Sequence, residues 1–410
     1  MRRRARRDEV GDVTVTVVGI DGAGLPAGAA EALGSARLVV GARRNLNAHA
    51  PEQARTLELE PLESALGALS ALAGAETGVV LVDGDPGFFG VLRSLRDRGI
   101  RCSVLPAASA VAKLMAHIGR PWEDVPVAVP GEQDLPRVIN LCRARPAVLV
   151  LTAPDAGPAQ LASGLAGWRR TLLVGEDVGG PDEKFTPVDP AEAATRTWAA
   201  NSVVLCTNQA HEQGPRSWLF GGERLPDSWG LSEDEFSHRD GDITPAEVRA
   251  VALAELAPRP GTLVWDVGAG SGSVAVECAR MGSATVAVES DEAQVVRLVT
   301  NAAGHGVDVR VEEGEAPKSL RELPKPDAVF VGGGGADVVT ACAHAGASRV
   351  VIELTELERV GPTRDALRAA GYEVRGVQLA ASRLVELDDG GSKLEPAAAV
   401  VVVSGRRKEP

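Results

Sequence analysis

Short apolar runs alternate with segments of helical length along the first half of the chain. Strand-like runs come at residues 13–20, 79–82, 102–105, 147–151, 171–174 and 202–206. The first of them, VTVTVVGI, leads through a glycine-rich turn and a helical stretch into a second apolar run, RLVVG. This rhythm is typical of α/β proteins. It predicts a domain at residues 12–207 with two α/β subdomains, at about 12–118 and 125–207, on either side of the proline-rich PWEDVPVAVPGEQDLP.

The periodic pattern fails between residues 208 and 240, and we interpret this polar stretch as an interdomain linker. A helix is predicted over ITPAEVRAVALAELAP, with Thr244 as its N-cap and Pro245 at its first position. Strand-like runs then recur at residues 263–265, 285–288, 307–311, 328–331, 349–352, 372–379 and 398–403. Helical segments separate all but the last two of these runs. The pattern predicts a Rossmann-like, seven-stranded sheet at residues 241–405 that ends in an antiparallel strand.

Composition narrows the partners that this chain could have. Its 410 residues carry a formal net charge of −13, whereas a nucleic-acid partner calls for a basic surface. The five cysteines form no CxxC pair and the six histidines lack metal-ligand spacing, so no metal is expected. The basic start, MRRRARR, runs into acidic residues instead of an apolar segment, and we expect residues 1–11 to be a disordered tail. No apolar run is long enough for a membrane span, so a cytoplasmic protein with a small-molecule partner is predicted.

The stretch LVWDVGAGSGSVAVE predicts a nucleotide pocket at the end of a strand. Gly268 and Gly270 fit the dinucleotide fingerprint, but its third glycine position is Ser273. Asp266, at the end of the strand, would repel a pyrophosphate and attract the ammonium and sulfonium of S-adenosylmethionine. The charge therefore favours S-adenosylmethionine. A tight turn in a Rossmann-like domain of other function is the alternative.

The strand ends that follow support the same interpretation. Glu289 ends the next strand. A carboxylate there can accept hydrogen bonds from both hydroxyls of a ribose, an interaction that NAD and S-adenosylmethionine each require. The motif VEEGEAP places Glu315 and Ala316 at the same sheet edge, near an adenine, and PDAVFVGGGG adds a glycine surface. Order and spacing together predict a methyltransferase.

Three loops of the first half also follow successive strands. They are VVGIDGAGL, LVDGDPGFFG and VLPAASAV. In the second of these, Gly84 and Gly87 allow unusual backbone angles and Pro86 fixes the turn, which opens the backbone toward a ligand. Loops at the carboxyl ends of neighbouring strands converge on one crevice, so the first half is predicted to contain a pocket of its own.

With these motifs in place, the chain resembles the bifunctional precorrin-6Y C5,15-methyltransferases (decarboxylating) of cobalamin biosynthesis over about residues 12–405. The motifs that carry the resemblance are VVGIDGAGL, VVGARRNL, DGDPGFFG, LPAASAV, IGRPWEDV and EDVGGPDE in the first half, and DGDITPAEVRA, WDVGAGSGSVAVE, EGEAPKSL, DAVFVGGGG and SRLVELDDGGSKLEP in the second. The chain departs from the family at Asn45, where a histidine is usual, and at Asp83, where a serine is usual. It also reads VPGEQD where the family has a His-Gly-Arg element, and IELTELE around Glu353 where asparagine or threonine is frequent. These departures concern substrate contacts more than cofactor loops.

The resemblance implies a tetrapyrrole methylase fold followed by a precorrin-6B type, class I methyltransferase domain. It implies two methyl transfers from S-adenosylmethionine, to carbons 5 and 15 of precorrin-6Y, with decarboxylation of the ring C acetate to give precorrin-8X. Carbon 5 is assigned to the first half, and carbon 15 and the decarboxylation to the second. It also implies self-association into a homo-oligomer.

Positions that match the family imply the cofactor-binding residues. In the second half these are Thr244, Gly268, Ala269, Gly270, Ser271, Gly272, Glu289 and Ala316, and Asp266 is added because of its charge. In the first half they are Gly22, Asp83, Gly84, Asp85 and Ser109. Because the substrate is a polycarboxylate and guanidinium pairs with carboxylate bidentately, arginines at pocket rims are the candidates for holding it. They are Arg43, Arg44, Arg249 and Arg383. No side-chain nucleophile is expected.

Three alternatives remain at this point. The first half could be a tetrapyrrole-binding module that supports a catalytic second half. The chain could be a nicotinamide-dependent oxidoreductase, which Asp266 and Ser273 oppose. Methyl transfer could also act on another polycarboxylate macrocycle.

Overall fold

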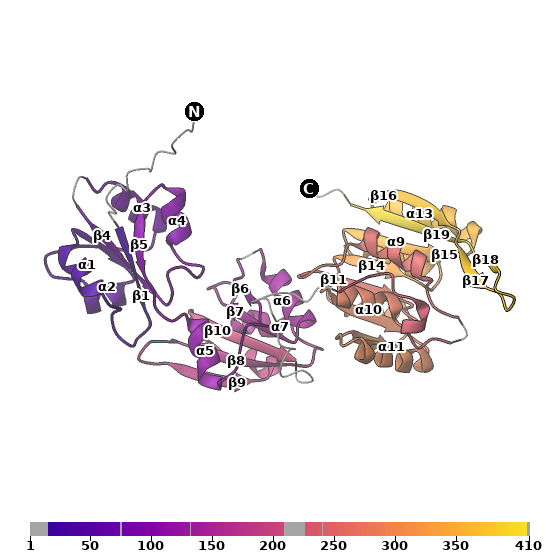
Figure 1. Ribbon diagram of the computed structural model, residues 1–410, viewed down its shortest axis with the longest axis horizontal. Coiled ribbons are helices and arrows are strands. Elements are labelled where there is room, and N and C mark those ends of the chain that lie inside the picture. The colour runs from indigo at the N-terminus through magenta and orange to yellow at the C-terminus, as the bar shows by residue number, and fades with distance from the viewer. Residues whose placement is uncertain (1–14, 74–75, 132, 209–225, 240, 408–410) are drawn as a thin grey trace, which may run out of the picture.

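Three α/β bodies follow one another along the chain and lie in a row (Figure 1). The computed structural model describes residues 15–73, 76–131, 133–208, 226–239 and 241–407. The tail expected at residues 1–11 and most of the linker expected at 208–240 lie outside them. Over the described ranges, every helix is too short or too polar to cross a lipid bilayer.

The first body is a parallel sheet in the order β3-β2-β4-β1-β5. Its strands are β1 (Val15–Ile20), β2 (Leu38–Gly41), β3 (Arg55–Glu58), β4 (Gly78–Asp83) and β5 (Cys102–Leu105). Its helices are α1 (Ala29–Ser35), α2 (Arg43–His49), α3 (Leu62–Ser70) and α4 (Leu92–Asp97). Strand β2 and residues 78–82 of β4 are apolar because helices cover both faces of such a sheet.

The second body is a mixed sheet in the order β6-β7-β10-β8-β9. Its strands are β6 (Val127–Ala128), β7 (Ala147–Leu151), β8 (Arg170–Glu176), β9 (Lys184–Val188) and β10 (Ser202–Asn208). Its helices are α5 (Ala110–Ile118), α6 (Leu135–Ala144), α7 (Pro158–Ser163) and α8 (Pro190–Ala193). Although α5 follows the first sheet in the chain, its apolar side chains pack against β7 and β10 of the second. The helix therefore ties the two bodies together.

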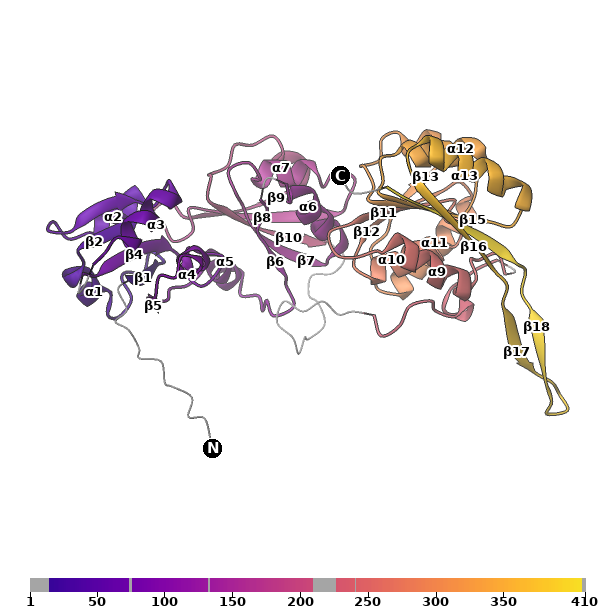
Figure 2. The same ribbon diagram turned by 90° about the horizontal axis from the view of Figure 1, so that it is seen from above.

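The third body is a doubly wound sheet in the order β13-β12-β11-β14-β15-β19-β16. Its strands are β11 (Leu263–Val267), β12 (Ala284–Glu289), β13 (Arg310–Glu313), β14 (Ala328–Val331), β15 (Arg349–Leu354), β16 (Glu373–Leu379) and β19 (Val400–Arg406). The helices are α9 (Ala246–Leu256), α10 (Ser273–Arg280), α11 (Glu292–Gly304), α12 (Ala336–His344) and α13 (Val360–Ala369), with single 3₁₀ turns at Glu233–Glu235, Lys318–Leu320 and Leu357–Arg359. Helices α9 to α11 cover one face and α12 and α13 the other (Figure 2).

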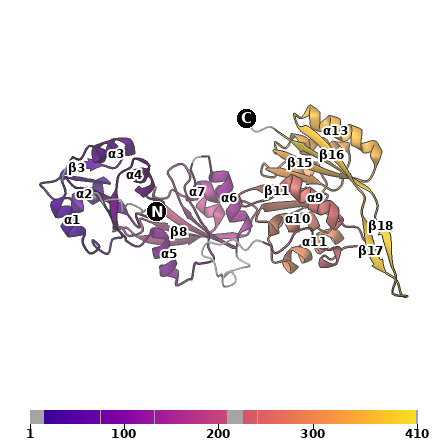
Figure 3. The same ribbon diagram turned by 45° about the horizontal axis from the view of Figure 1, so that its top comes forward.

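The predicted fold class is confirmed, down to the antiparallel last strand. Strand β19 is antiparallel to both of its neighbours, β15 and β16, between which it is inserted. The hairpin of β17 (Ser382–Glu386) and β18 (Ser392–Pro396) was not predicted from the sequence. It projects from the end of the third body that lies away from the first two (Figures 2 and 3). Its strands escaped prediction because their side chains are almost all exposed, so burial imposes no apolar alternation on them.

Candidate active sites

A cleft of about 1100 Å³ opens at the carboxyl edge of the third sheet. Its walls come from the segments that follow β11, β12, β13 and β14, and from residues that precede α9. The lining residues include Arg239, Asp242, Gly268, Gly270, Glu289, Asp291, Gln294, Glu315, Ala316 and the run Gly332 to Gly335. This is the edge at which open α/β sheets bind their ligands.

Glycine shapes the turn between β11 and α10. Gly268, Gly270 and Gly272 have φ values of 69°, 55° and 78°, a left-handed region that other residues rarely adopt. A Cβ at Gly268 would lie 2.8 Å from the backbone of Gly333, so two glycine segments approach each other closely at the floor of the cleft. The turn therefore offers bare backbone to a ligand.

Asp266 lies beneath this turn and does not line the cleft. Its side chain is buried, and its Oδ2 accepts a hydrogen bond of 2.8 Å from the backbone N–H of Ala275 in the first turn of α10. Burial raises the pKa of Asp266 to about 7, against the lowering effect of that hydrogen bond. The carboxylate expected to attract a sulfonium thus holds the start of a helix and is partly protonated near neutral pH.

Glu289 ends β12 and does line the cleft. Its Oε2 accepts from the backbone N–H of Gly270 at 2.8 Å, and its Oε1 accepts from Ser290 and Asp291 at 2.7 and 2.8 Å. Three backbone donors fix the orientation of this carboxyl group. Ala316 lies on the same wall, as its sequence position implied.

Other expected cofactor residues lie next to the cleft without lining it. Ala269 packs beside Leu298, and Ser271 is buried, with its carbonyl accepting from Asn301. Thr244 precedes α9 and donates from Oγ1 to Glu353 Oε2 at 2.8 Å.

Sequence reasoning missed a polar wall of the cleft. Arg239 forms an ion pair of 2.6 Å with Asp291, and Asp242 accepts a hydrogen bond of 3.0 Å from the amide of Gln294. Asp242 belongs to the motif DGDITPAEVRA, but no local pattern reveals these contacts, because the residues meet only through the folding of the segment before α9 onto α11.

Arg249 does not lie at a rim, contrary to expectation. Its side chain is fully buried, and its Nε lies 2.5 Å from Glu277 Oε1. Its two terminal nitrogens donate to the carbonyls of Thr244 and Leu231. With these groups engaged inside the protein, it cannot hold a substrate carboxylate without being extracted from the core, and we do not carry it forward as a substrate residue.

Arg383, on the projecting hairpin, pairs with carboxylates as well. It lies 2.6 Å from Glu233 and 2.9 Å from Glu247, at the start of α9. The guanidinium is about half exposed and joins the base of the hairpin to the third body.

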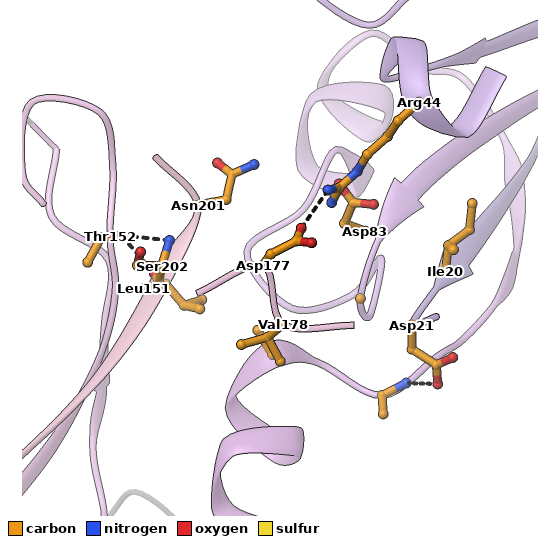
Figure 4. A pocket seen from close by; sticks show the side chains of 13 residues that line it. Ile20, Asp21, Arg44, Asp83, Leu151, Thr152, Asp177, Val178, Asn201 and Ser202 are labelled. Atoms are coloured by element: carbon orange, nitrogen blue, oxygen red, sulfur yellow. Dashed lines mark hydrogen bonds and ion pairs between the residues drawn. The ribbon is translucent and has the colours of Figure 1, made fainter. Parts of the chain in front are cut away.

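The first cleft, named for its place in the first half of the chain, has a volume of about 650 Å³ and lies between the first and second bodies (Figure 4). The first body contributes Ile20, Asp21, Arg44, Asp83 and Gly84, and the second contributes Leu151, Thr152, Asp177, Val178, Asn201 and Ser202, with Ala108 and Ala110 between them. Arg44 reaches across it: its Nη2 lies 3.0 Å from Asp83 Oδ2 and its Nη1 lies 2.9 Å from Asp177 Oδ1. Asn45 donates to Asp83 Oδ1 at 2.9 Å.

The remaining expected residues of the first half surround this cleft. Gly84 has a φ of 71° and lies against Ser109, whose Oγ caps α5 by accepting from Ala112. A Cβ on Gly22 would overlap the carbonyl of Gly179, so the two bodies meet there.

Like Gly22 and Ser109, two more of the expected residues in the first half do not line the first cleft. Asp85 accepts from Gly87 within its own turn. Arg43 is exposed and pairs with Glu58, 2.6 Å away. Of the two neighbouring arginines, only Arg44 faces the cleft.

The comparisons with known proteins agree with this division of the chain. Residues 14–194 match the family of tetrapyrrole (corrin/porphyrin) methylases, and residues 234–402 match the precorrin methyltransferase domain. The chain is therefore a methyltransferase that joins two methylase domains. A precorrin-6Y C(5,15)-methyltransferase [decarboxylating] from Sinorhizobium sp is 35% identical over 341 residues, 79% of each chain. The chain belongs to the family of precorrin-6Y C(5,15)-methyltransferases (decarboxylating).

Two further similarities concern parts of the chain. A probable cobalt-precorrin-6B C(15)-methyltransferase (decarboxylating) from Pyrobaculum calidifontis is 38% identical over 165 residues, 38% of this chain and 84% of that protein. The crystal structure of a precorrin-6Y C5,15-methyltransferase from Geobacter metallireducens is 26% identical and covers 44% of this chain and 97% of that one, with a TM-score of 0.41.

Proposed function

We propose that this chain transfers two methyl groups from S-adenosylmethionine to carbons 5 and 15 of precorrin-6Y and decarboxylates the ring C acetate, giving precorrin-8X. The observation that carries the proposal is the presence of two clefts at strand ends, one in each of two matched methylase domains. The name of the relative that matches across both domains supports the same substrate.

The residues of the third body fit S-adenosylmethionine. The bare turn at Gly268 and Gly270 leaves room for a ligand close to the backbone, and Glu289 presents an ordered carboxylate to a ribose. We assign Gly268, Gly270, Glu289 and Ala316 to direct contact. Asp266, Gly272 and Ser271 position the turn from beneath, and Thr244 borders the cleft.

In the first half, we assign Gly84 and Asp83 to the contact region, with Gly22 and Ser109 shaping the loops around it. Asp85 supports the turn of the same loop. Bound S-adenosylmethionine supplies an activated methyl group at either cleft. The residues of each cleft would align the macrocycle carbon with that methyl group, a contribution of up to roughly 7 to 11 kcal/mol.

Decarboxylation needs a place for the electron pair of the broken carbon–carbon bond. The conjugated macrocycle accepts that pair as carbon dioxide leaves, and a proton later replaces it. The reaction therefore needs no metal or lysine adduct from the protein. The second half is the proposed location, because residues 234–402 match the precorrin methyltransferase domain and the family resemblance assigns the decarboxylation to this half.

Arg44 is the proposed anchor for a substrate carboxylate in the first cleft. It lines the cleft and presents two terminal nitrogens in the fork that matches a carboxylate. Its present partners, Asp83 and Asp177, are carboxylates that a substrate group would replace or join. Arg43 and Arg383 remain proposed as outer contacts, because both are exposed and already paired.

The second candidate is a first half that binds the tetrapyrrole without methylating it. The observation that favours it is Asp83, which lines the cleft at a position where the family usually has serine. Asp83 forms an ion pair with Arg44. Incubation with precorrin-6Y and a labelled methyl donor decides between the two. Two added methyl groups and one carbon dioxide support the bifunctional enzyme, and one methyl group supports a binding module.

A nicotinamide cofactor is tested separately. S-adenosylmethionine is expected to raise the midpoint temperature of thermal unfolding, and NAD is expected to leave that temperature unchanged. Two predictions stay with this proposal: a cytoplasmic location, inferred from the apolar pattern of the sequence, and a homo-oligomeric state, which the family resemblance implies.

A further inference from the structure

The cleft of the first half lies at one end of the second sheet. Leu151 ends β7, Asp177 follows β8 and Ser202 begins β10, and the strand register places these residues side by side. The opposite end of the same sheet carries Arg170, which begins β8, and Asn208, which ends β10 and pairs with it in register.

The third body docks on this opposite end. Arg170 is fully buried, and its Nη1 lies 2.8 Å from Asp308 Oδ2, which also accepts from Asn208 at 3.1 Å. Asn140 of α6 donates to the carbonyl of Gly261 at 3.2 Å. Trp168 is buried in the apolar core of the third body. The halves are thus joined by one ion pair, two polar contacts and a buried tryptophan.

All of these contacts reach the third sheet at its amino edge. Gly261 precedes β11 and Asp308 precedes β13. The cleft residues Gly268, Glu289 and Gly314 instead lie at the carboxyl ends of β11, β12 and β13. The third sheet therefore meets the second body at its amino edge and carries its cleft at the opposite, carboxyl edge. The three bodies lie in a row (Figures 1 and 2).

Two sheets in series thus separate the two clefts. Strand β8 has seven residues and β11 has five, which placed end to end span roughly 40 Å at about 3.3 Å per residue. The space between them is filled by Arg170, Trp168 and their neighbours. A tetrapyrrole bound in one cleft cannot swing into the other while the halves stay docked.

We propose, resting on the function proposed above, that the singly methylated tetrapyrrole is released from one cleft and reaches the other through solution. The docked amino edge of the third sheet fixes the two clefts back to back. Fusion of the domains then ensures that the two sites are made in equal numbers. It does not provide direct transfer of the intermediate from one site to the other.

The test follows formation of doubly methylated product from precorrin-6Y and labelled S-adenosylmethionine by the full chain. Release predicts a lag before this product appears, and the lag lengthens tenfold when the enzyme is diluted tenfold, because the second site must capture free intermediate. Transfer within a chain or within a stable oligomer predicts a lag independent of enzyme concentration, which would overturn the inference. Absence of any methylation would overturn the proposed function instead.

A second measurement mixes two separately purified full-length variants, Gly84→Leu in the first cleft and Gly268→Leu in the second. Release predicts that the mixture forms product within about twofold of the wild-type rate at equal concentrations of intact sites. A rate more than tenfold lower, from variants with wild-type circular dichroism, contradicts it. If either variant fails to fold, the lag of the unaltered chain still decides.

Loosening the docking contact gives an independent readout. Asp308→Asn removes the charge opposite Arg170 and touches neither cleft. The overall rate is expected to stay unchanged within about twofold. A fall of tenfold or more with both single methyl transfers intact would show that docking serves transfer of the intermediate.

Discussion

Arg44 and Asp177 belong to different bodies of the first half, yet their side chains form an ion pair of 2.9 Å across the first cleft. The two partners are separated by 133 residues in the chain. Because Arg44 also pairs with Asp83, it is held over the cleft by one carboxylate from each body. Such an arginine is poised to exchange a protein carboxylate for one on a substrate.

We expect Arg44→Gln to raise the KM of the first half for its tetrapyrrole by about 10- to 100-fold. The loss corresponds to about 1.5 to 3 kcal/mol, the usual value of a hydrogen bond to a charged group. Steady-state methylation at carbon 5 measures it. Arg37→Gln is the matched control, since Arg37 pairs with Glu76 on the surface and does not line the cleft. Equal effects of the two substitutions would remove Arg44 as the anchor.

Gly268→Ala is expected to abolish binding of S-adenosylmethionine to the second half alone. The new Cβ would lie 2.8 Å from the backbone of Gly333, at a φ of 69° that already costs alanine about 1 kcal/mol. Calorimetry should then count one bound cofactor per chain instead of two. Gly371→Ala is the control, because it has a φ of 87° and open space around it. Two cofactors bound to the Gly268 variant would contradict the assignment.

The raised pKa of Asp266 predicts a pH dependence of folding stability. Burial lifts this pKa from 3.8 to about 7, so between these values the folded state holds a proton that the unfolded state has lost. The free energy of unfolding should therefore fall as pH rises from about 4 to about 7, and level off above, by up to about 4 kcal/mol.

Asp266→Asn isolates this contribution, because its side-chain oxygen still accepts from the N–H of Ala275. Urea denaturation from pH 4 to 8 should show the variant gaining stability relative to wild type as pH rises. A difference between the two proteins that stays constant across this range would show that Asp266 titrates normally.

The fold was largely predictable from the sequence, whereas the polar contacts of the sites were not. Strands β11, β12 and β14 are buried on both faces, and so their apolar runs stand out in the sequence. The glycine turn was found because only glycine tolerates its backbone angles. Arg249 was wrongly placed at a pocket rim because the residue type alone does not reveal whether an arginine side chain is exposed or buried. Its burial depends on Glu277, 28 residues away, which no local pattern reveals.

The Arg249–Glu277 pair gives a further stability prediction. Arg249→Met leaves Glu277 buried without its cation and should cost about 3 to 5 kcal/mol in the free energy of unfolding, measured with urea. Adding Glu277→Gln should recover a large part, since the amide carries no charge and its oxygen still accepts from the backbone N–H of Gly230. If Arg249 instead served a substrate, the folded single variant would show an altered KM and little loss of stability.

Trp168 tests whether the two halves unfold together. It lies in the chain segment before β8, yet it is buried in the core of the third body together with Leu263 and Ala284 at the amino edge of that sheet. Trp168→Ala removes this anchor and should cost about 3 to 5 kcal/mol of docking and core packing. Calorimetric unfolding, expected as one transition for the wild type, should split into two. Trp198→Ala is the control, because Trp198 packs within the second body on Ala193. Splitting by both variants, or by neither, would mean that Trp168 does not couple the halves.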